Sequence, residues 1–367
     1  MPPREPPPRR GPPPPPRKTR ISSSSLGWIV LTLLLAGLGI LAFQGPNERQ
    51  TDFAADYIVF DAQGHRGARG LAPENTLPGF AEALAIGVHT LELDVVMTAD
   101  GVPVVLHDPV LNPDLTRGPD GAWIGATPLP VGELTLEELR RYDVGRAKPG
   151  SRAAGRFPEQ QGQDGVAVPS LAEVIALAEA QSGGEARYNV ETKLSPEHPE
   201  LTPPPAAFAD AVIAVLRDAG VAERSTLQSF DWRTLQRAQV AAPEIDTAYL
   251  TAEQDWLDNI RRGEAGGSPW LAGHDIEDAE GLVPVLVNRA GGDIWSPYYR
   301  DLREVDLRDA HKLGLRVVVW TVNDPGDMAS LIELGVDGII TDYPDRLKSV
   351  LAEFGLPDPP AYPRAAD

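Results

Sequence analysis

The chain of 367 residues contains no cysteine, which excludes disulfides, thiolate nucleophiles and thiolate metal sites. A secreted or periplasmic location stays open, because a protein of this length can bury a large core without covalent cross-links. Basic side chains are also scarce, with 33 Lys and Arg against 53 Asp and Glu and a formal net charge of −20. Such an acidic protein repels nucleic acid, and no basic stripe interleaved with aromatic residues offsets this. We therefore expect no nucleic-acid partner.

Residues 1–24 differ from the rest of the chain in charge and composition. They hold six basic side chains and one acidic side chain, a net charge of +5, so the remainder carries about −25 by subtraction. A segment so rich in proline and arginine cannot bury a hydrophobic core, and we expect a disordered tail. The acidic remainder is better suited to binding a divalent cation than to binding a polyanion.

Residues 25–44 are predicted to form a transmembrane signal anchor. The uncharged run from Leu26 to Phe43 would span roughly 27 Å as a helix, which is just enough to cross a bilayer. The basic flank precedes this run, so the tail should stay in the cytoplasm and the body should be exported. We expect a single-pass inner-membrane protein whose body is periplasmic or extracellular. The alternative is a secreted protein with a cleaved signal peptide, although only a poor cleavage site follows the run.

After a linker at 45–56, the body at 57–352 alternates apolar stretches with helical patterns. Eight strands alternating with helices indicate a (β/α)8 TIM barrel, and a doubly wound open sheet is the alternative. The eight predicted strands lie within 57–67, 89–98, 186–193, 225–230, 246–251, 293–299, 315–322 and 337–344.

The stretch TLELDVVMTADGVPVVLHDP, Thr90 to Pro109, interrupts this alternation. Its turn at Asp100-Gly101 is too short for a parallel crossover, so we predict a hairpin whose second arm returns antiparallel. The Gly-, Pro- and Asp-rich residues 108–169 follow as a long insertion, which should overhang whatever lies at the end of that arm. The tail at 353–367 is expected to be frayed.

Polar residues fall at the carboxyl ends of the predicted strands, where the reactive groups of such barrels lie. Glu92 and Asp94 share one face of their strand, and Glu191 and Lys193 share one face of another. Carboxylates that converge on one barrel mouth repel one another unless they are protonated or bridged by a cation. Oxygen ligands favour Mg²⁺ or Ca²⁺.

Arg66 and Lys193 add positive charge suited to a phosphate, and His65 and His107 can exchange protons near neutral pH. Together these groups indicate cleavage of a phosphoester with acid–base assistance. Structural alternatives stay open: a solvated Glu-x-Asp face, a core histidine, or a Lys193–Glu191 pair that only stabilises the fold. Further purely structural readings are a helix cap at Asn75 or Thr76, ordinary packing of Trp320, and surface or core positions for His89, His198, His274 and His311.

Six motifs in fixed order carry a resemblance to a known family: GHRGARGLAPENTLPGF, LELDVVMTADGVPVVLHDP, NVETK, QSFDW, VVWTVND and DGIITDYP. Between about residues 60 and 350 the chain resembles the glycerophosphodiester phosphodiesterases, and its insertion resembles that of their periplasmic branch. The resemblance implies several roles. His65 and His107 would be the acid–base pair, Arg66 and Lys193 phosphate contacts, Glu92, Asp94 and Glu191 ligands of one Ca²⁺ or Mg²⁺ ion, Glu74 a support for the first-strand site, and Trp320 a wall against the glycerol.

The resemblance also implies the reaction. Family members hydrolyse small glycerophosphodiesters to sn-glycerol 3-phosphate and an alcohol, by attack of the glycerol 2-hydroxyl on phosphorus and opening of the resulting cyclic phosphate by water. Two alternatives remain: a lipid-cleaving phosphodiesterase of the phospholipase C or sphingomyelinase D type, and an inactive relative that binds glycerophosphodiesters. The leaving alcohol, the choice between Ca²⁺ and Mg²⁺ and the oligomeric state stay open.

Overall fold

The computed structural model of this chain describes residues 60–363. The predicted tail at 1–24, anchor at 25–44 and linker at 45–56 lie outside the described residues. Among the helices of the described part, none is long and apolar enough to cross a membrane.

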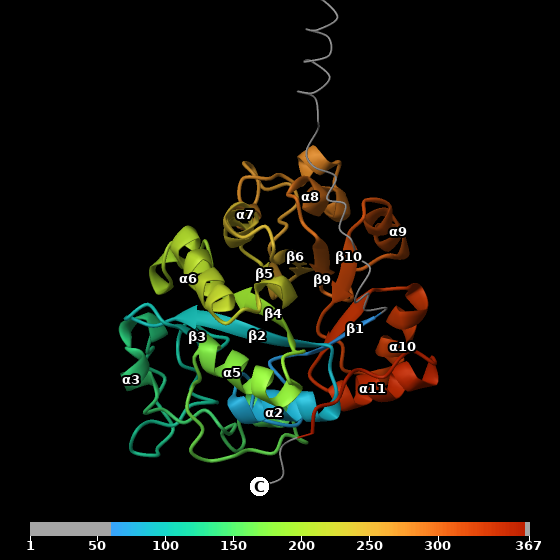
Figure 1. Cartoon of the computed structure of the whole chain (residues 1–367). Helices are drawn as coiled ribbons and strands as arrows, with labels where there is room; N and C mark the ends of the chain where they lie inside the picture. The colour runs from blue at the N-terminus through green and yellow to red at the C-terminus, as the bar shows by residue number, and fades with distance from the viewer. Residues whose placement is uncertain (1–59, 364–367) are drawn as a thin grey trace, which may run out of the picture. The chain divides into compact units, whose positions relative to one another are not determined.

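Eight parallel strands form a closed barrel, with helices on its outside (Figure 1). Closure follows from β1, which pairs in parallel with β11 on one side and with β2 on the other. The predicted TIM barrel is therefore confirmed, and each predicted stretch supplies one barrel strand. In ring order the strands are β1 (Asp61–Gly64), β11 (Gly338–Thr341), β10 (Arg316–Val319), β9 (Ile294–Pro297), β6 (Asp246–Thr251), β5 (Ser225–Ser229), β4 (Arg187–Thr192) and β2 (Thr90–Met97).

The helices of the outer layer begin and end where local sequence signals direct. Ser170 and Glu173 form a capping box at the start of α5, and Gly183 ends that helix in the left-handed conformation. Thr76 caps α2 by accepting a hydrogen bond from the Gly79 amide. The outer helices are α2 (Leu77–Ile86), α5 (Leu171–Ser182), α6 (Pro205–Asp218), α7 (Trp232–Ala241), α8 (Val283–Arg289), α9 (Glu304–Lys312), α10 (Pro325–Leu334) and α11 (Pro344–Glu353).

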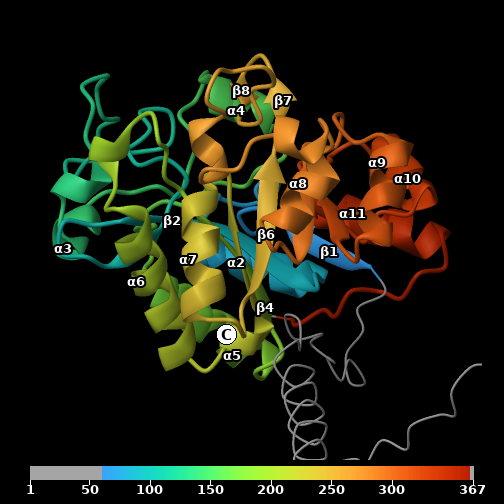
Figure 2. The same ribbon diagram turned by 90° about the horizontal axis from the view of Figure 1, so that it is seen from above.

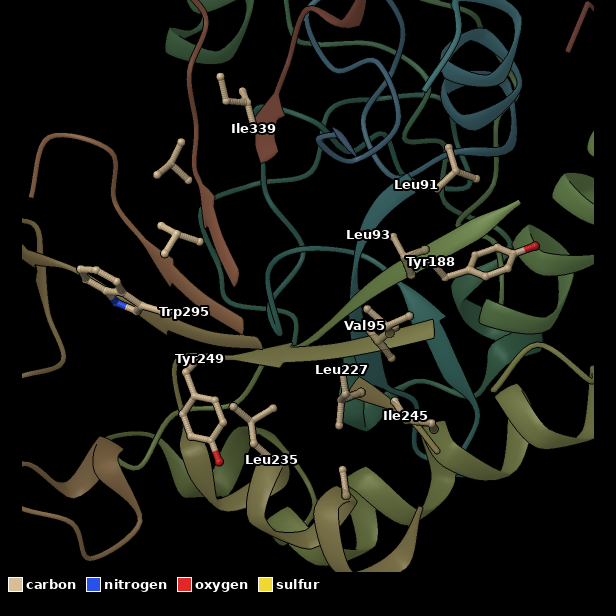
Figure 3. Packing of buried hydrophobic residues seen from close by; sticks show 14 of the residues in the cluster. Leu91, Leu93, Val95, Tyr188, Leu227, Leu235, Ile245, Tyr249, Trp295 and Ile339 are labelled. Carbon is tan, nitrogen blue, oxygen red and sulfur yellow. The ribbon is translucent and has the colours of Figure 1, made fainter. Parts of the chain in front are cut away.

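The main core lies between the barrel strands and these helices (Figure 3). Leu91, Leu93 and Val95 of β2 belong to it and are almost completely buried. Because side chains of a strand alternate between its two faces, Glu92 and Asp94 project to the opposite face, into the barrel. The apolar half of β2 thus holds the strand in place while its acidic half faces the interior.

The predicted hairpin is confirmed. β3 (Pro103–Val105) pairs antiparallel with β2, and Gly101 adopts a positive φ of 77° in the turn. The insertion that follows contains η1 (Val131–Glu133), α3 (Leu136–Leu139) and α4 (Arg152–Arg156). A second, smaller apolar cluster anchors it to the hairpin, formed by Val96, Val104, Leu111, Val131, Leu139, Val144 and Val168. The remaining short elements are η2 (Pro199–Leu201), η3 (Ala222–Arg224), β7 (Glu253–Gln254), β8 (Leu257–Asp258), η4 (Pro269–Leu271) and η5 (Glu277–Ala279).

The C-terminal segment differs from the expected frayed tail over the part that the structure describes. The Tyr362 amide donates to the Leu84 carbonyl at 2.7 Å, and the Tyr362 carbonyl accepts from Gln181 at 2.7 Å. Its hydroxyl donates to Glu185 at 3.0 Å. The tail is ordered up to residue 363 because its backbone finds these partners on α2 and α5, a possibility that a Pro- and Ala-rich sequence does not signal.

Candidate active site

A cavity of about 1330 Å³ opens at the carboxyl ends of the barrel strands. Figure 2 shows α4 and the β7–β8 hairpin at this end of the barrel, toward which the arrow of β6 points. Glu74 and Asp94 do not line the cavity but contact Arg66, which does. The other predicted site residues all line it: His65, Arg66, Glu92, His107, Glu191, Lys193 and Trp320.

Glu92, Asp94 and Glu191 form a buried carboxylate cluster, in which one oxygen of each lies within 4.8 Å of the others. Strand register creates this cluster, because Asp94 of β2 and Glu191 of β4 are directly paired residues of neighbouring parallel strands. Asp94 Oδ1 is buried and has no hydrogen-bond partner in the described part of the chain. A buried oxygen without a partner is costly, and coordination of a hard cation would satisfy it.

The electrostatics of the cluster also fit a cation. Burial and the neighbouring carboxylates raise the pKa of Glu92, and burial raises the pKa of Glu191 to about 7. Burial also acts to raise the pKa of Asp94, but Arg66 at 3.1 Å and Lys193 at 3.7 Å hold it below its usual range. When all three carboxylates are ionised, they exceed the charges of Arg66 and Lys193 by one negative charge. A divalent cation would reverse this to one positive charge, which suits a phosphodiester monoanion.

Arg66 is positioned by its backbone and by its side chain. It has a φ of 52°, and its amide donates to Glu92 Oε2 at 2.9 Å. Its guanidinium donates to Glu74 Oε1 at 2.8 Å, and Arg69 donates to the other oxygen of Glu74 at 2.6 Å. Gly67 has no room for a side chain, since an added Cβ would lie 2.7 Å from the backbone of Gly79 at the start of α2. The close approach of the β1 loop to α2 thus aims Arg66 at the carboxylates.

His65 and His107 each bind a carboxylate through Nδ1. His65 lies 2.6 Å from Asp342, and His107 lies 2.5 Å from Asp108. A carboxylate on Nδ1 requires that nitrogen to carry the proton, which makes Nε2 the basic nitrogen of the neutral ring. Nε2 of His65 accepts a hydrogen bond from Arg66 Nε at 3.3 Å. Burial lowers the pKa of His65, while burial, Arg66 and Lys193 lower that of His107 to about 4. Both rings are therefore neutral at pH 7 in the free protein.

Several site residues were not predicted in these roles. Asn75 was expected at most to cap α2, but Thr76 is the cap, and Asn75 donates to Asp94 Oδ2 at 2.8 Å. Asp342 and Gln228 fall in the predicted strand stretches 337–344 and 225–230 but were given no role, and Gln228 donates to Glu92 at 2.7 Å. Their position at strand ends was the available signal, whereas nothing in the sequence pairs Asn75 with a residue 19 positions away.

Trp320 belongs to a larger group of rings on one side of the cavity, which we call the aromatic wall: Phe230, Trp256, Tyr298 and Trp320. Phe230 and Trp320 pack edge to face with centroids 5.2 Å apart, and Trp256 packs in the same way against Tyr298 at 5.3 Å. Of these four rings, only Trp320 was predicted to contact the substrate.

Of the histidines given no chemical role, His198 lines the mouth of the cavity, which was not expected. Three lie outside the cavity lining, as expected: His89, whose Nδ1 accepts from the Ala62 amide, His274 and His311.

Known proteins of one family match this chain. The model of the glycerophosphoryl diester phosphodiesterase family matches residues 65–346. A glycerophosphodiester phosphodiesterase of Bacillus subtilis is 27% identical over 333 residues, covering 88% of this chain and 97% of its own. One from Caldanaerobacter subterraneus is 28% identical over 291 residues, covering 79% of this chain and 97% of its own.

A crystal structure from Silicibacter pomeroyi, assigned to the same family, is 38% identical and superposes with a TM-score of 0.72 over 82% of this chain and 96% of that one. The family model spans most of the barrel, from the first site histidine to the start of α11. The chain therefore belongs to the glycerophosphoryl diester phosphodiesterase family.

Proposed function

We propose that this protein hydrolyses glycerophosphodiesters to sn-glycerol 3-phosphate and an alcohol, with the help of one divalent cation and two histidines. The convergence of Glu92, Asp94 and Glu191 beside Arg66 and Lys193 carries this proposal, since it joins a cation site to an anion site. Membership of the family and the names of its curated relatives support the same activity.

The residues that would hold the cation are Glu92, Asp94 and Glu191, and their oxygen donors suit Ca²⁺ and Mg²⁺ alike. When bound, such a cation neutralises charge on a phosphoryl oxygen and orients the phosphate. Arg66 and Lys193, already fixed beside the carboxylates, supply the complementary contacts to the phosphodiester. Glu74 holds the Arg66 guanidinium in place, and Trp320 offers an apolar surface for the glycerol carbons.

The two histidines would divide the proton transfers of the first step. The bound phosphodiester places a negative charge near both rings and raises their pKa values, so that one ring can be protonated in the complex. The neutral ring takes the proton of the glycerol 2-hydroxyl as its oxygen attacks phosphorus. The bond from phosphorus to the leaving oxygen breaks, and the protonated ring gives its proton to that oxygen. The products are a free alcohol and a cyclic glycerol phosphate.

Water then opens the cyclic phosphate, and the two histidines exchange their roles as acid and base. The histidine that gave up its proton takes one from the attacking water, and the histidine that gained a proton returns it to the 2-oxygen of glycerol as the cyclic bond breaks. Both side chains end in their starting states. Asp342 and Asp108, on the Nδ1 atoms of His65 and His107, make Nε2 the nitrogen of each ring that exchanges protons.

A turnover assay on the full-length chain tests the proposal. We expect release of glycerol 3-phosphate from glycerophosphocholine, loss of activity on exhaustive chelation, and recovery when Ca²⁺ or Mg²⁺ is added. Phosphorus NMR under single-turnover conditions should reveal the cyclic phosphate. Phosphatidylcholine and sphingomyelin vesicles provide the comparison substrates. Turnover of vesicles alone would favour the lipid-cleaving alternative, and no turnover of any substrate would favour an inactive binding protein.

We also propose that residues 25–44 anchor the chain in the inner membrane with the barrel exported, which rests on the uncharged run and the basic flank before it. After fractionation, the chain should remain in the membrane pellet through alkaline carbonate washing. Protease added to spheroplasts should digest the barrel from outside. A chain recovered in soluble form and starting beyond residue 44 would instead establish a cleaved signal peptide.

A further inference from the structure

The mouth of the cavity has a second charged region opposite the aromatic wall. We call it the basic rim: Arg69, Arg152 and Arg156, all of which line the cavity. Arg69 follows β1, whereas Trp256 of the aromatic wall follows β6. In the ring of eight strands, β6 lies four strands from β1 in either direction, so Arg69 and Trp256 lie on opposite sides of the opening.

The insertion is attached on the β1 side, which keeps α4 next to Arg69. The side chain of Gln160 donates to the Arg69 carbonyl at 2.8 Å, and the amide of Gln161 donates to the Leu71 carbonyl at 2.8 Å. The ring of Phe157 packs against two guanidinium groups. The Cζ atoms of Arg69 and Arg156 lie 4.6 Å and 5.4 Å from the centroid of the ring.

These contacts bring the positive charges of the basic rim close together and close to Arg66. Burial and then the neighbouring Arg66 and Arg156 act to lower the pKa of Arg69. Arg152 and Arg156 are four residues apart on α4, a helix of only five residues, and like charges at this spacing destabilise a helix. An anion bound at this place would offset the mutual repulsion of these positive charges.

Among residues 60–363, no carboxylate forms an ion pair with Arg152 or Arg156. Both are exposed, and within residues 60–363 neither makes a hydrogen bond or an ion pair. Arg69 shares its partner, Glu74, with Arg66. The cavity lining as a whole holds six Lys and Arg side chains and five Asp and Glu side chains, whereas the chain has 33 and 53. The mouth is thus locally basic in an acidic protein, as expected where an anion must be attracted.

We propose that the basic rim binds a second anionic group, a phosphate or phosphodiester carried by the leaving alcohol. This inference rests on the proposed hydrolysis of glycerophosphodiesters. Arg69 shares Glu74 with Arg66, so the basic rim begins beside the proposed phosphate site, within reach of a group carried by the leaving alcohol. The cavity of about 1330 Å³ exceeds the range of roughly 300–1,000 Å³ that is usual for small-ligand sites, so a longer substrate has room.

The rim residues would act in binding and not in bond cleavage. A guanidinium presents two parallel N–H donors that match two oxygens of a phosphate group. Arg152 and Arg156 project from one helix and could contact the same group, while Arg69 joins the rim to the phosphate site at Arg66. Substrates with a second phosphate would therefore bind more tightly than matched substrates without one, and screening by salt would reduce this advantage.

A matched pair of substrates tests the inference on the full-length chain. The first is glycerophosphoglycerol. The second is the same molecule with a further glycerophosphate on its leaving glycerol, which contains two equivalent scissile bonds. The measured quantity is the ratio of kcat/KM for the second substrate to that for the first, divided by two for the extra bond. We expect a ratio of about five to ten, the size that two partly exposed charge-assisted contacts supply.

The double variant Arg152→Gln/Arg156→Gln should reduce this ratio to near one. A control variant with the same change in net charge, Arg141→Gln/Arg308→Gln, removes two exposed arginines that do not line the cavity, and it should keep the wild-type ratio. In the wild type, raising the salt from about 0.02 to about 0.3 M should lower the ratio without any mutation.

The outcomes separate the two proposals. If the wild type cleaves both substrates with a ratio near one, or if the rim variant keeps a high ratio, the basic rim has no role in selecting the leaving group. If the wild type cleaves neither substrate in the presence of Ca²⁺ or Mg²⁺, the proposed hydrolysis itself is wrong. A loss of the ratio in the control variant as well would assign the effect to overall charge.

Discussion

The floor and the rim of the cavity contain charged groups held in different ways. At the floor, Glu92 and Asp94 are each 1% exposed. Glu92 accepts hydrogen bonds from the Arg66 amide in the loop after β1 and from Gln228 of β5. By the rim of the cavity we mean its exposed opening, which includes the basic rim and Trp256 of the aromatic wall. There, Trp256 is 59% exposed and Arg152 has no polar partner in the described part of the chain. Strand register positions the floor, whereas loops and a five-residue helix position the rim.

This difference indicates a division of labour. Groups fixed by paired strands cannot shift without disturbing the barrel, so they suit chemistry that requires accurate positions. Exposed loop residues can vary at little cost to folding, so they suit the selection of a leaving group. Changes at the floor should therefore lower kcat strongly, and changes at the rim should act weakly and mainly on KM.

The largest effect is expected from the catalytic histidines. His65→Ala and His107→Ala should each reduce kcat for glycerophosphocholine by about 100- to 10,000-fold, because each removes a proton-transfer group. Steady-state kinetics and thermal unfolding measure the loss and verify the fold. His311→Ala, which removes an exposed histidine outside the cavity, serves as the control. Activity within a factor of two of wild type in both cavity variants would disprove the acid–base assignment.

The two aspartates behind the histidines allow a direct comparison of burial. Asp342 is fully buried between His65 and Asn323, whereas the Asp108 side chain is 40% exposed. Asp342→Asn should lower kcat by about 10- to 100-fold with little change in KM, since no water can replace the lost carboxylate. Asp108→Asn should cost less than about tenfold, because water can reach His107. Equal losses in the two variants would contradict the role given to burial.

Acid should weaken the packing of the insertion through Asp143. Burial acts to raise the pKa of Asp143, but hydrogen bonds from the amides of Gly145, Gly165 and Val166, together with Arg117, lower it overall. A carboxylate with a lowered pKa stabilises the folded state above its unfolded pKa of about 3.9, and this contribution is lost as pH falls through the folded value.

Asp143→Asn should remove about 1–2 kcal/mol of local stability at pH 6. Hydrogen exchange of residues 144–168 should be faster in the variant than in wild type at that pH, while exchange in β4 stays the same. The difference between the two proteins should close as the pH falls below 4. A difference that persists at pH 2.5 would show that the charge of Asp143 does not hold the insertion.

The smallest effect is expected at Trp256. Its ring packs against Tyr298 and Trp320 but is largely exposed. Trp256→Ala should raise KM by about two- to fivefold and leave kcat within a factor of two, because it removes binding that is equal in the ground and transition states. A tenfold loss of kcat without a change in KM would place Trp256 with the floor, and the distinction between floor and rim would need revision.

Much of the fold could be predicted because its signals are local. Strand and helix periodicity, the capping box at Ser170 and the turn at Asp100-Gly101 each depend on a few neighbouring residues. The Glu92-x-Asp94 spacing likewise places two carboxylates on one face. The family resemblance added the roles of Glu74 and Trp320, which no local pattern indicates. The anchor at 25–44 lies outside the described residues and stays a prediction.

The sequence by itself determined the alternating strands and helices, the hairpin, and the chemical types of the side chains at the strand ends, because these depend on composition and on spacing along the chain. Only the tertiary structure decided which side chains meet. Asn75 reaches Asp94, Asp342 reaches His65 from the last strand, and Arg69 lies near Arg156 across a shared ring. These meetings depend on barrel closure and on the path of the insertion, which join residues that no local spacing relates.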